Sequence, residues 1–331
     1  GALDEMGIRH KFVYGSPEDM ETIDEIVDHA KAAMAVKGLS ESYLGKFGGR
    51  TGGMYTATAD MTQVRDLFGV EYNHVDQYRL ILEAQNLSDE VVGKALDEVR
   101  SDFGQIDISE DVLERSVRLY LALGRIASED GYDFTCVKCM PEVSDNYCSC
   151  CLAVSLANDD GIVTSCECDI NAAITMQILK LLAEGPVLFG DVNHLDKEEG
   201  ILRLVNCGSM ATGLAKSRED VDLSMQYEYL SEAGGATTTF CCKPGKVTLA
   251  RLARIEGKYV MQIATGEAIE YPKEKFKEAR GRWPHAFIKL DGDWSKFSQN
   301  CRSNHQHMVY GDVKGELLEL CEILEIEPIV T

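Results

Sequence analysis

The spacing of apolar positions changes at about residue 165. Before that point, short runs rich in β-forming residues alternate with longer stretches of helical period, which is typical of βαβ units built around a parallel sheet. Residues 1–165 are therefore expected to form a Rossmann-like α/β domain. Its predicted strands are Arg9–Tyr14, Ser42–Phe47, Val70–Val75 and Phe134–Lys138.

Two amphipathic segments of this part are predicted to be helices that cover the sheet. In each, apolar residues recur every three or four positions and form one stripe. The first helix runs from Pro17 to Lys37 and the second from Val112 to Ile126. The first stripe comprises Ile23, Ile26, Val27, Ala30 and Met34, and the second includes Leu113, Val117, Tyr120 and Leu121.

Residues 166–331 have a different pattern. From Ala236 to Glu270 polar and apolar residues nearly alternate, and Glu256-Gly257-Lys258 supplies a hairpin-type turn. We expect a mainly antiparallel, barrel-like β domain with flanking helices. Its predicted elements are the helix Asn171–Leu182, the strand Pro186–Val192, the hairpin strands Val247–Ile255 and Tyr259–Ala268, the helix Val313–Leu324 and a short apolar end at Ile326–Val330.

Composition and charge exclude several classes of partner. The 331 residues include 33 Lys plus Arg against 55 Asp plus Glu, a net charge of −22 that repels nucleic acids and anionic membranes. No apolar run approaches the roughly 20 residues that span a bilayer, and no secretory signal is seen. A cytoplasmic location is therefore expected.

Twelve cysteines in a chain without a secretory signal indicate reduced thiols rather than disulfides. Their spacing leaves a second interpretation open, a zinc or iron–sulfur site. Because these cysteines fall in or beside predicted core elements, packing as small hydrophobic side chains is the favoured reading. The sequences concerned are Cys136-x-x-Cys139, Cys148-x-Cys150-Cys151 and Cys166-x-Cys168.

Three segments carry residues suited to catalysis or metal binding. Glu142 follows a predicted strand, where α/β sheets present their ligand-binding loops, although an acid in a loop is commonly just solvated. Asp169 sits at the start of an apolar helix, where it could cap the helix or act chemically. His305 and His307 share one face of an extended strand, and a His-x-His pair alone is a weak metal signal.

A glycine-rich segment, 48–54, follows the second predicted strand and includes Arg50. Glycine lets a backbone approach a ligand closely, but a tight turn explains the segment equally well. It matches neither the dinucleotide-binding pattern nor a P-loop.

Taken together, these segments resemble the L-fucose isomerase and L-arabinose isomerase superfamily over nearly the whole chain. The similar blocks keep the family's order, from the glycine-rich loop to the last strand. They are Gly48-Gly49-Arg50-Thr51-Gly52-Gly53-Met54, Cys166-Glu167-Cys168-Asp169, Gly185-Pro186-Val187-Leu188-Phe189-Gly190-Asp191-Val192, Asn206-Cys207-Gly208-Ser209, Trp283-Pro284 and Ser303-Asn304-His305.

The resemblance implies a metal site and an oligomer. Metal ligands carry over to Glu142, Asp169 and His305, with His194 as an additional ligand, and the mainly hard donor set favours Mn²⁺, or Mg²⁺ or Co²⁺. Family members also have a further N-terminal α/β domain, so this chain is expected to be a fragment, and the family assembles as trimers or hexamers. Implied substrate-binding residues are Asn304, Arg50 and Trp283, the last of which could instead fill a core.

The expected activity is aldose–ketose isomerisation of a small sugar, a pentose or a 6-deoxyhexose. Glu142 and Asp169 would share the proton transfer between C1 and C2 through an enediol, while the metal polarises the carbonyl. Two other functions stay open: a non-catalytic sugar-binding or regulatory protein of the same fold, and a cysteine-rich metal or redox protein.

Overall fold

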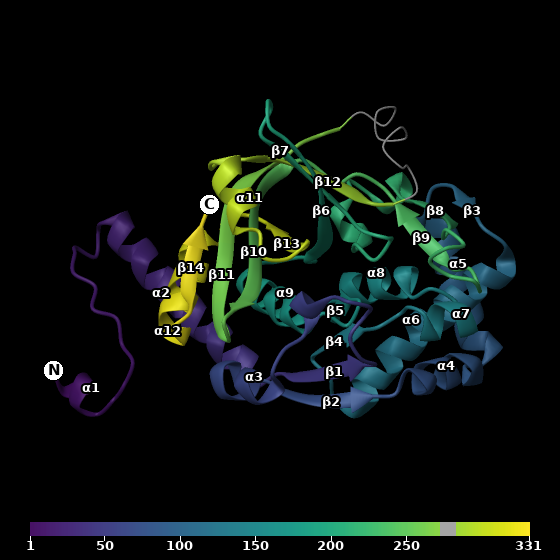
Figure 1. Ribbon diagram of the computed structural model, residues 1–331, viewed down its shortest axis with the longest axis horizontal. Helices are drawn as coiled ribbons and strands as arrows, with labels where there is room; N and C mark the ends of the chain where they lie inside the picture. Colours follow the sequence, from purple (N-terminus) through teal and green to yellow (C-terminus); the bar gives the residue numbers. More distant parts are fainter. Residues whose placement is uncertain (272–282) are drawn as a thin grey trace.

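The computed structural model describes residues 1–271 and 283–331, and its main body consists of two sheets with helices around and between them (Figure 1). Four of the strands up to Cys166 form a parallel sheet, and the larger sheet that follows is mainly antiparallel. The predicted fold class, a Rossmann-like parallel sheet followed by a mainly antiparallel β domain, is confirmed.

The parallel sheet has the order β2-β1-β4-β5. The bounds are Tyr43–Phe47 for β1, Glu71–Val75 for β2, Phe134–Val137 for β4 and Val163–Cys166 for β5. Both faces of β4 and β5 are buried, and their buried Thr135 and Thr164 hydroxyl groups hydrogen-bond to each other at 2.8 Å. Val137 and Cys166 are paired at the ends of these strands, so the loops that follow them emerge side by side.

Helices cover both faces of this sheet. Alternate residues of β1 and β4 enter two different cores: Phe47 and Val137 pack with α4, α5, α6 and α8, and Leu44 and Cys136 pack with α2, α3 and α9. The bounds are Ala2–Glu5 for α1, Met20–Ser40 for α2, Met61–Phe68 for α3, Gln77–Asn86 for α4, Asp89–Asp102 for α5, Glu110–Asp130 for α6, Glu142–Asn146 for α7, Cys151–Asp159 for α8 and Ile170–Leu182 for α9.

The second sheet closes into a barrel. Its order is β10-β13-β6-β7-β12-β11-β14, and β10 also pairs with β11, which joins the sheet to itself. The predicted barrel-like form is therefore confirmed. The bounds are Leu188–Asp196 for β6, Ile201–Val205 for β7, Gly245–Ile255 for β10, Lys258–Ala268 for β11, His285–Leu290 for β12, His305–Tyr310 for β13 and Glu327–Val330 for β14, with helices α11 at Trp294–Asn300 and α12 at Lys314–Leu324.

Two features join the halves of the chain. A three-stranded sheet pairs β3 of the first half with β8, which in turn pairs with β9. Helix α9 packs on β4 and β5 and also contacts β10 and β13, so it lies between the parallel sheet and the barrel (Figure 1). The bounds are Ile106–Asp107 for β3, Asp222–Met225 for β8 and Ala236–Thr239 for β9, and three 3₁₀ turns cover Tyr55–Ala57, Thr212–Leu214 and Arg218–Asp220.

Two predictions for the N-terminal segment are wrong. Residues Arg9–Tyr14 form no strand, because this segment runs outside the sheet with Phe12 82% and Tyr14 91% exposed. In α2 the buried residues are not the predicted stripe but Ala32, Ala35 and Leu39. The packing partners α9 and α12 approach α2 on this small-residue face, and they leave the larger side chains of Ile26, Val27 and Met34 exposed.

Most of the other predicted elements are confirmed within a few residues. The hairpin turn at Glu256-Gly257 joins β10 to β11, with Glu256 at φ 52° and Gly257 at φ 82°. The buried stripe of α6 includes Leu113 and Val117 as expected. Among the described helices, none combines the length and apolar character needed to cross a bilayer.

A buried histidine in β12 should make stability depend on pH. Burial lowers the pKa of His285 to about 4, whereas an unfolded histidine titrates near 6.5. The unfolded state therefore binds the extra proton first, so the stabilisation is complete above about pH 6.5 and is lost as the pH falls towards 4. The free energy of unfolding, measured with urea, should change between pH 4 and pH 7 by about 2 to 3 kcal/mol less in His285→Gln than in the natural chain.

Candidate functional site

The candidate site begins at the loop between β5 and α9. Glu167 and Cys168 have φ values of 61° and 53°, a left-handed conformation that costs free energy for residues with a side chain. Thr51, in the glycine-rich segment, donates a hydrogen bond from Oγ1 to the carbonyl oxygen of Glu167 at 2.9 Å. This loop geometry turns Asp169 into the N-cap position of α9.

Asp169 is fully buried and has three partners. Its Oδ1 accepts a hydrogen bond from the backbone N–H of Ala172 at 2.9 Å, as an N-cap does. Its Oδ2 lies 2.7 Å from His305 Nδ1 and 2.9 Å from Arg251 Nη2. Capping and a buried charge network are thus combined in one carboxylate, and the capping role that the sequence suggested is confirmed.

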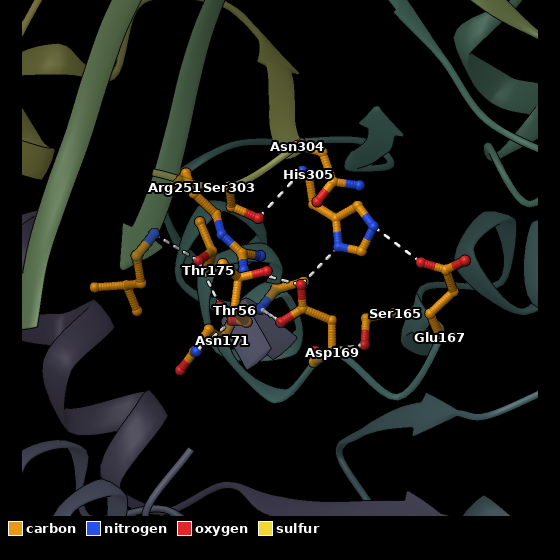
Figure 2. Close-up of polar contacts among 12 residues, drawn as sticks. Thr56, Ser165, Glu167, Asp169, Asn171, Thr175, Arg251, Ser303, Asn304 and His305 are labelled. Carbon is orange, nitrogen blue, oxygen red and sulfur yellow. Dashed lines mark hydrogen bonds and ion pairs between the residues drawn. The ribbon is translucent and has the colours of Figure 1, made fainter. Parts of the chain in front are cut away.

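His305 stands at the start of β13, beside β6, and presents its two ring nitrogens to different carboxylates (Figure 2). Nδ1 faces Asp169. Nε2 lies 2.9 Å from Glu167 Oε2 and 3.5 Å from Asp191 Oδ1, yet within the described part of the chain it makes no well-directed hydrogen bond. Asn304 donates from Nδ2 to Asp191 Oδ1 at 2.6 Å and so completes this side of the site.

The charges in this cluster shift one another's pKa values. Burial alone would raise the pKa of Asp169, but Arg251 and His305 outweigh it and hold that pKa well below its usual range. Burial would lower the pKa of His305, but the carboxylates of Asp169 and Glu167 raise it to about 9. Burial raises the pKa of Asp191 to about 6, despite the opposing effect of His305. A carboxyl that titrates near neutrality beside a cationic imidazole is typical of a functional site.

Arg251 connects Asp169 to His307 and to the 3₁₀ turn at Tyr55–Ala57. It lies on β10 and is 1% exposed, and its other contacts are His307 Nε2 at 3.2 Å and the carbonyl oxygen of Thr56 at 3.2 Å. Burial, followed by the nearby Arg251 cation, lowers the pKa of His307 well below its usual value. His307 is thus a neutral partner of Arg251. Among the described residues, its contacts do not include the carboxylates that surround His305.

The structure brings together only part of the site that the sequence predicts. Asp169 and His305 are in direct contact. Glu142 begins α7 with its side chain 47% exposed, and its contact is an ion pair with Lys138. That ion pair outweighs the opposing effect of partial burial and lowers the pKa of Glu142. Glu142 lies in the loop after β4, at the same sheet edge as the loop that carries Asp169.

The other predicted residues fall in different places. Asn304 is at the site, where it holds Asp191. Arg50 is exposed and places its guanidinium over the ring of Tyr55 at 4.2 Å, and Trp283 donates from Nε1 to Gln226 Oε1 at 3.0 Å. His194 is exposed at a bulge in β6, and no described contact joins it to His305.

Three residues of the cluster were not predicted as site residues: Glu167, Asp191 and Arg251. A signal for each was present in the sequence. Glu167 is the second carboxylate of the Cys166–Asp169 segment, and Asp191 is a charged residue within the predicted apolar strand Pro186–Val192. Arg251 is a charged residue between Ala250 and Leu252 in a strand whose neighbours are buried. Buried charges require partners, and these partners come from distant parts of the chain.

The donor chemistry around His305 Nε2 fits a hard divalent cation. One imidazole nitrogen without a hydrogen-bond partner faces two carboxylates, those of Glu167 and Asp191. Asp169 contacts the other ring nitrogen, Nδ1. In metal sites a carboxylate that does not itself bind the metal commonly holds a histidine ligand in this way. Within residues 1–271 and 283–331, no three such side chains are already arranged as a metal site, so binding would require the side chains to move.

Asp191 should lower the stability of the metal-free protein. Its pKa in the folded state, about 6, exceeds that of an unfolded aspartate, so ionisation disfavours the fold as the pH rises from about 4 to 6. The side chain is 36% accessible, which reduces the effect by solvent screening. Asp191→Asn is therefore expected to stabilise chelator-treated protein by about 1 kcal/mol at pH 7 and by nothing at pH 4, as measured by urea unfolding. Equal unfolding curves at pH 7 would contradict the assignment.

The cysteines form no disulfide among the described residues, and most are buried. A small, largely apolar cavity beside the Glu167 loop is lined by several of them: Cys139, Cys150, Cys151, Cys166 and Cys207. The Sγ atom of Cys136 lies 3.4 Å from that of Cys168. These thiols pack in the core as small side chains do.

Comparison with known proteins shows what this chain is similar to. Residues 204–330 match the model of the L-fucose isomerase C-terminal domain. A sulfoquinovose isomerase of Alkalicoccus urumqiensis is 23% identical over 325 residues, which cover 97% of this chain and 72% of that protein. A sulfoquinovose isomerase of Clostridium sp. (strain MSTE9) is 25% identical over 331 residues, covering 96% of this chain and 71% of that protein.

A third relative gives the same result. The sulfoquinovose isomerase of Priestia megaterium (strain ATCC 12872 / QMB1551) is 23% identical over 318 residues, or 96% of this chain and 70% of that protein. The matches thus confirm both the predicted resemblance and the predicted enzyme class: this chain is a sugar isomerase similar to the L-fucose isomerase superfamily.

Proposed function

We propose that this chain interconverts an aldose and a ketose at the cluster around His305, with the help of a bound divalent cation, Mn²⁺ being favoured. The observation that carries the proposal is the buried Asp169–His305 pair, in which His305 Nε2 lies 2.9 Å from the carboxylate of Glu167 and 3.5 Å from that of Asp191. Stability alone does not explain this buried pair, because apolar residues packed in the same volume are often as stable as a buried ion pair.

His305, Glu167 and Asp191 are the proposed cation ligands. This differs from the set taken over from the family resemblance, in which Glu142 and Asp169 join His305. The revised set is supported by Asp169 lying on the other side of the imidazole, where Arg251 already neutralises it. When bound, the cation supplies a Lewis acid for the sugar's oxygens at C1 and C2.

Glu142 is the proposed carrier of the proton between C1 and C2. Its carboxylate is exposed and forms an ion pair with Lys138, which favours the ionised form, and it follows β4, the strand that pairs with β5 ahead of Glu167. Asp169 is a weaker candidate for this task than the sequence suggested, since a carboxylate whose pKa is held so low accepts a proton poorly. Its role here is to fix the ring of His305 and keep Nδ1 protonated.

The substrate is proposed to be a single sugar unit, and sulfoquinovose is the first to test, because the relatives are named for it. The pentoses and 6-deoxyhexoses expected from the sequence are represented by L-arabinose and L-fucose. Each sugar is incubated with the protein and Mn²⁺, and the aldose and ketose are quantified by NMR. Conversion of one or more of them towards equilibrium is expected.

The competing function is a sugar-binding protein of the same fold. It would give saturable binding of a sugar by calorimetry, with no ketose formed at any Mn²⁺ concentration. The net charge of −22 keeps nucleic acids and anionic membranes unlikely as partners under either function.

A further inference from the structure

We propose that the protein has a second binding site, for a small organic oxyanion, in a cavity behind the catalytic cluster. The cavity has a volume of about 340 Å³ and lies between the β10–β11 hairpin and the 3₁₀ turn at Tyr55–Ala57. Its volume is at the lower end of the range for small-molecule sites. The lining residues used below are Arg251, Arg254, Arg302, Asn171, Thr58 and Ser303.

The lining has one sign of charge. Three arginines contribute to it, and none of its ten residues is acidic, in a chain whose net charge is −22. Asn171, Thr58 and Ser303 add neutral polar groups between the cations. A concave site with converging cations concentrates anions, and guanidinium groups bind oxyanions with two parallel hydrogen bonds.

The arginines have unused binding capacity. Arg254 and Arg302 are exposed, and the described residues give neither an ion pair; the guanidinium of Arg254 lies 5.8 Å from the centroid of the Tyr259 ring. Arg251 is 1% exposed, and its Nε atom is buried without a hydrogen-bond partner among the described residues. An unpaired buried donor is costly, so a buried guanidinium that lines a cavity with Nε unsatisfied indicates a missing acceptor.

The anion site is separate from the proposed sugar site. Nε2 of His305, Glu167 and Asp191 are absent from the cavity lining, and Asp169 is reached from the cavity only through Arg251 in the described contacts. Figure 2 shows this arrangement, with Arg251 and Glu167 on opposite sides of the Asp169–His305 pair. The anion therefore need not be the sugar.

The test is calorimetric titration at constant ionic strength in a chloride buffer. Inorganic phosphate, methanesulfonate and acetate are the probes, and they distinguish phosphate, sulfonate and carboxylate as the bound group. At least one probe should bind saturably with one site per chain. The double variant R254Q/R302Q should bind it about tenfold more weakly, while K258Q should stay within twofold, because Lys258 is an exposed cation of the same hairpin outside the cavity.

Arg251 is not replaced, because its loss would also leave Asp169 without its cation. Circular dichroism and the melting temperature establish that the double variant is folded, which its exposed positions favour. Absence of saturable binding for all three probes would overturn the proposal, as would unchanged affinity in R254Q/R302Q or an equal loss in K258Q. Because binding is measured without sugar, failure here is distinguishable from failure of the isomerase assignment.

Discussion

Asp169→Asn is expected to destabilise the protein by about 3 to 5 kcal/mol and to lower isomerase turnover by about a hundredfold or more. The replacement keeps the size of the side chain, and asparagine also caps helices well, so α9 retains its N-cap. What is lost is the negative charge between Arg251 and His305, which would leave the buried Arg251 without its carboxylate and His305 with carboxylates at Nε2 alone. Urea unfolding and the rate of ketose formation measure the two effects.

Asp60→Asn is the matched control for this prediction. Asp60 caps α3 through the backbone N–H groups of Thr62 and Gln63, but it has no described cationic partner. Exchanging one good capping residue for another should change stability by less than about 1 kcal/mol and leave turnover intact. If Asp169→Asn behaved like Asp60→Asn, the buried charge network would have no energetic or catalytic importance.

Removal of divalent metal is expected to abolish turnover, and Mn²⁺ should restore it. The amount of Mn²⁺ bound per chain in variants of the candidate residues then identifies which of them hold the cation. In Glu167→Gln, Mn²⁺ affinity should fall by at least the 10- to 100-fold that is typical of disrupting even an outer partner of a metal site. Glu142→Gln should retain Mn²⁺ and lose turnover, because Glu142 is assigned to proton transfer rather than to the cation.

The opposite result would restore the ligand set expected from the sequence. Loss of Mn²⁺ in Glu142→Gln with full retention in Glu167→Gln would show that α7 moves towards His305 when the cation binds. Turnover that persists through exhaustive chelation would exclude a metal role altogether. Calorimetric titration with Mn²⁺ at pH 7 measures each affinity on protein that has been freed of metal.

Much of the fold follows from local patterns in the sequence. The predicted strand at Phe134–Lys138 is found as Phe134–Val137, buried on both faces as a strand of a parallel sheet usually is. The strand Val163–Cys166 was not predicted, because Thr164 and Ser165 interrupt its apolar residues. The alternation along β10 and β11, with glycine at the turn, likewise identifies a hairpin. Closure of the barrel by pairing β10 with both β11 and β13 depends on distant segments, which local spacing does not encode.

The errors have a common physical cause. In α2, several faces carry apolar residues, and the face that is buried was determined by α9 and α12, which the periodicity of α2 cannot anticipate. In the candidate site, Asp169 and His305 could be predicted from the family resemblance. Arg251 and Asp191 stand out only as charged residues beside apolar ones, and local spacing cannot identify their partners, which lie 82 and 114 residues away in the sequence, 251 − 169 and 305 − 191.

The most direct test of the central claim is the conversion of a single sugar by His305→Gln. His305 joins Asp169 to the two carboxylates at its Nε2, and glutamine cannot contact both sides as the imidazole does. With the sugar that the natural chain converts, and with saturating Mn²⁺, we expect His305→Gln to form ketose at less than about one hundredth of the natural rate. His194→Gln, at an exposed position, should retain the full rate. Turnover of folded His305→Gln within a few-fold of the natural rate would contradict the placement of the active site.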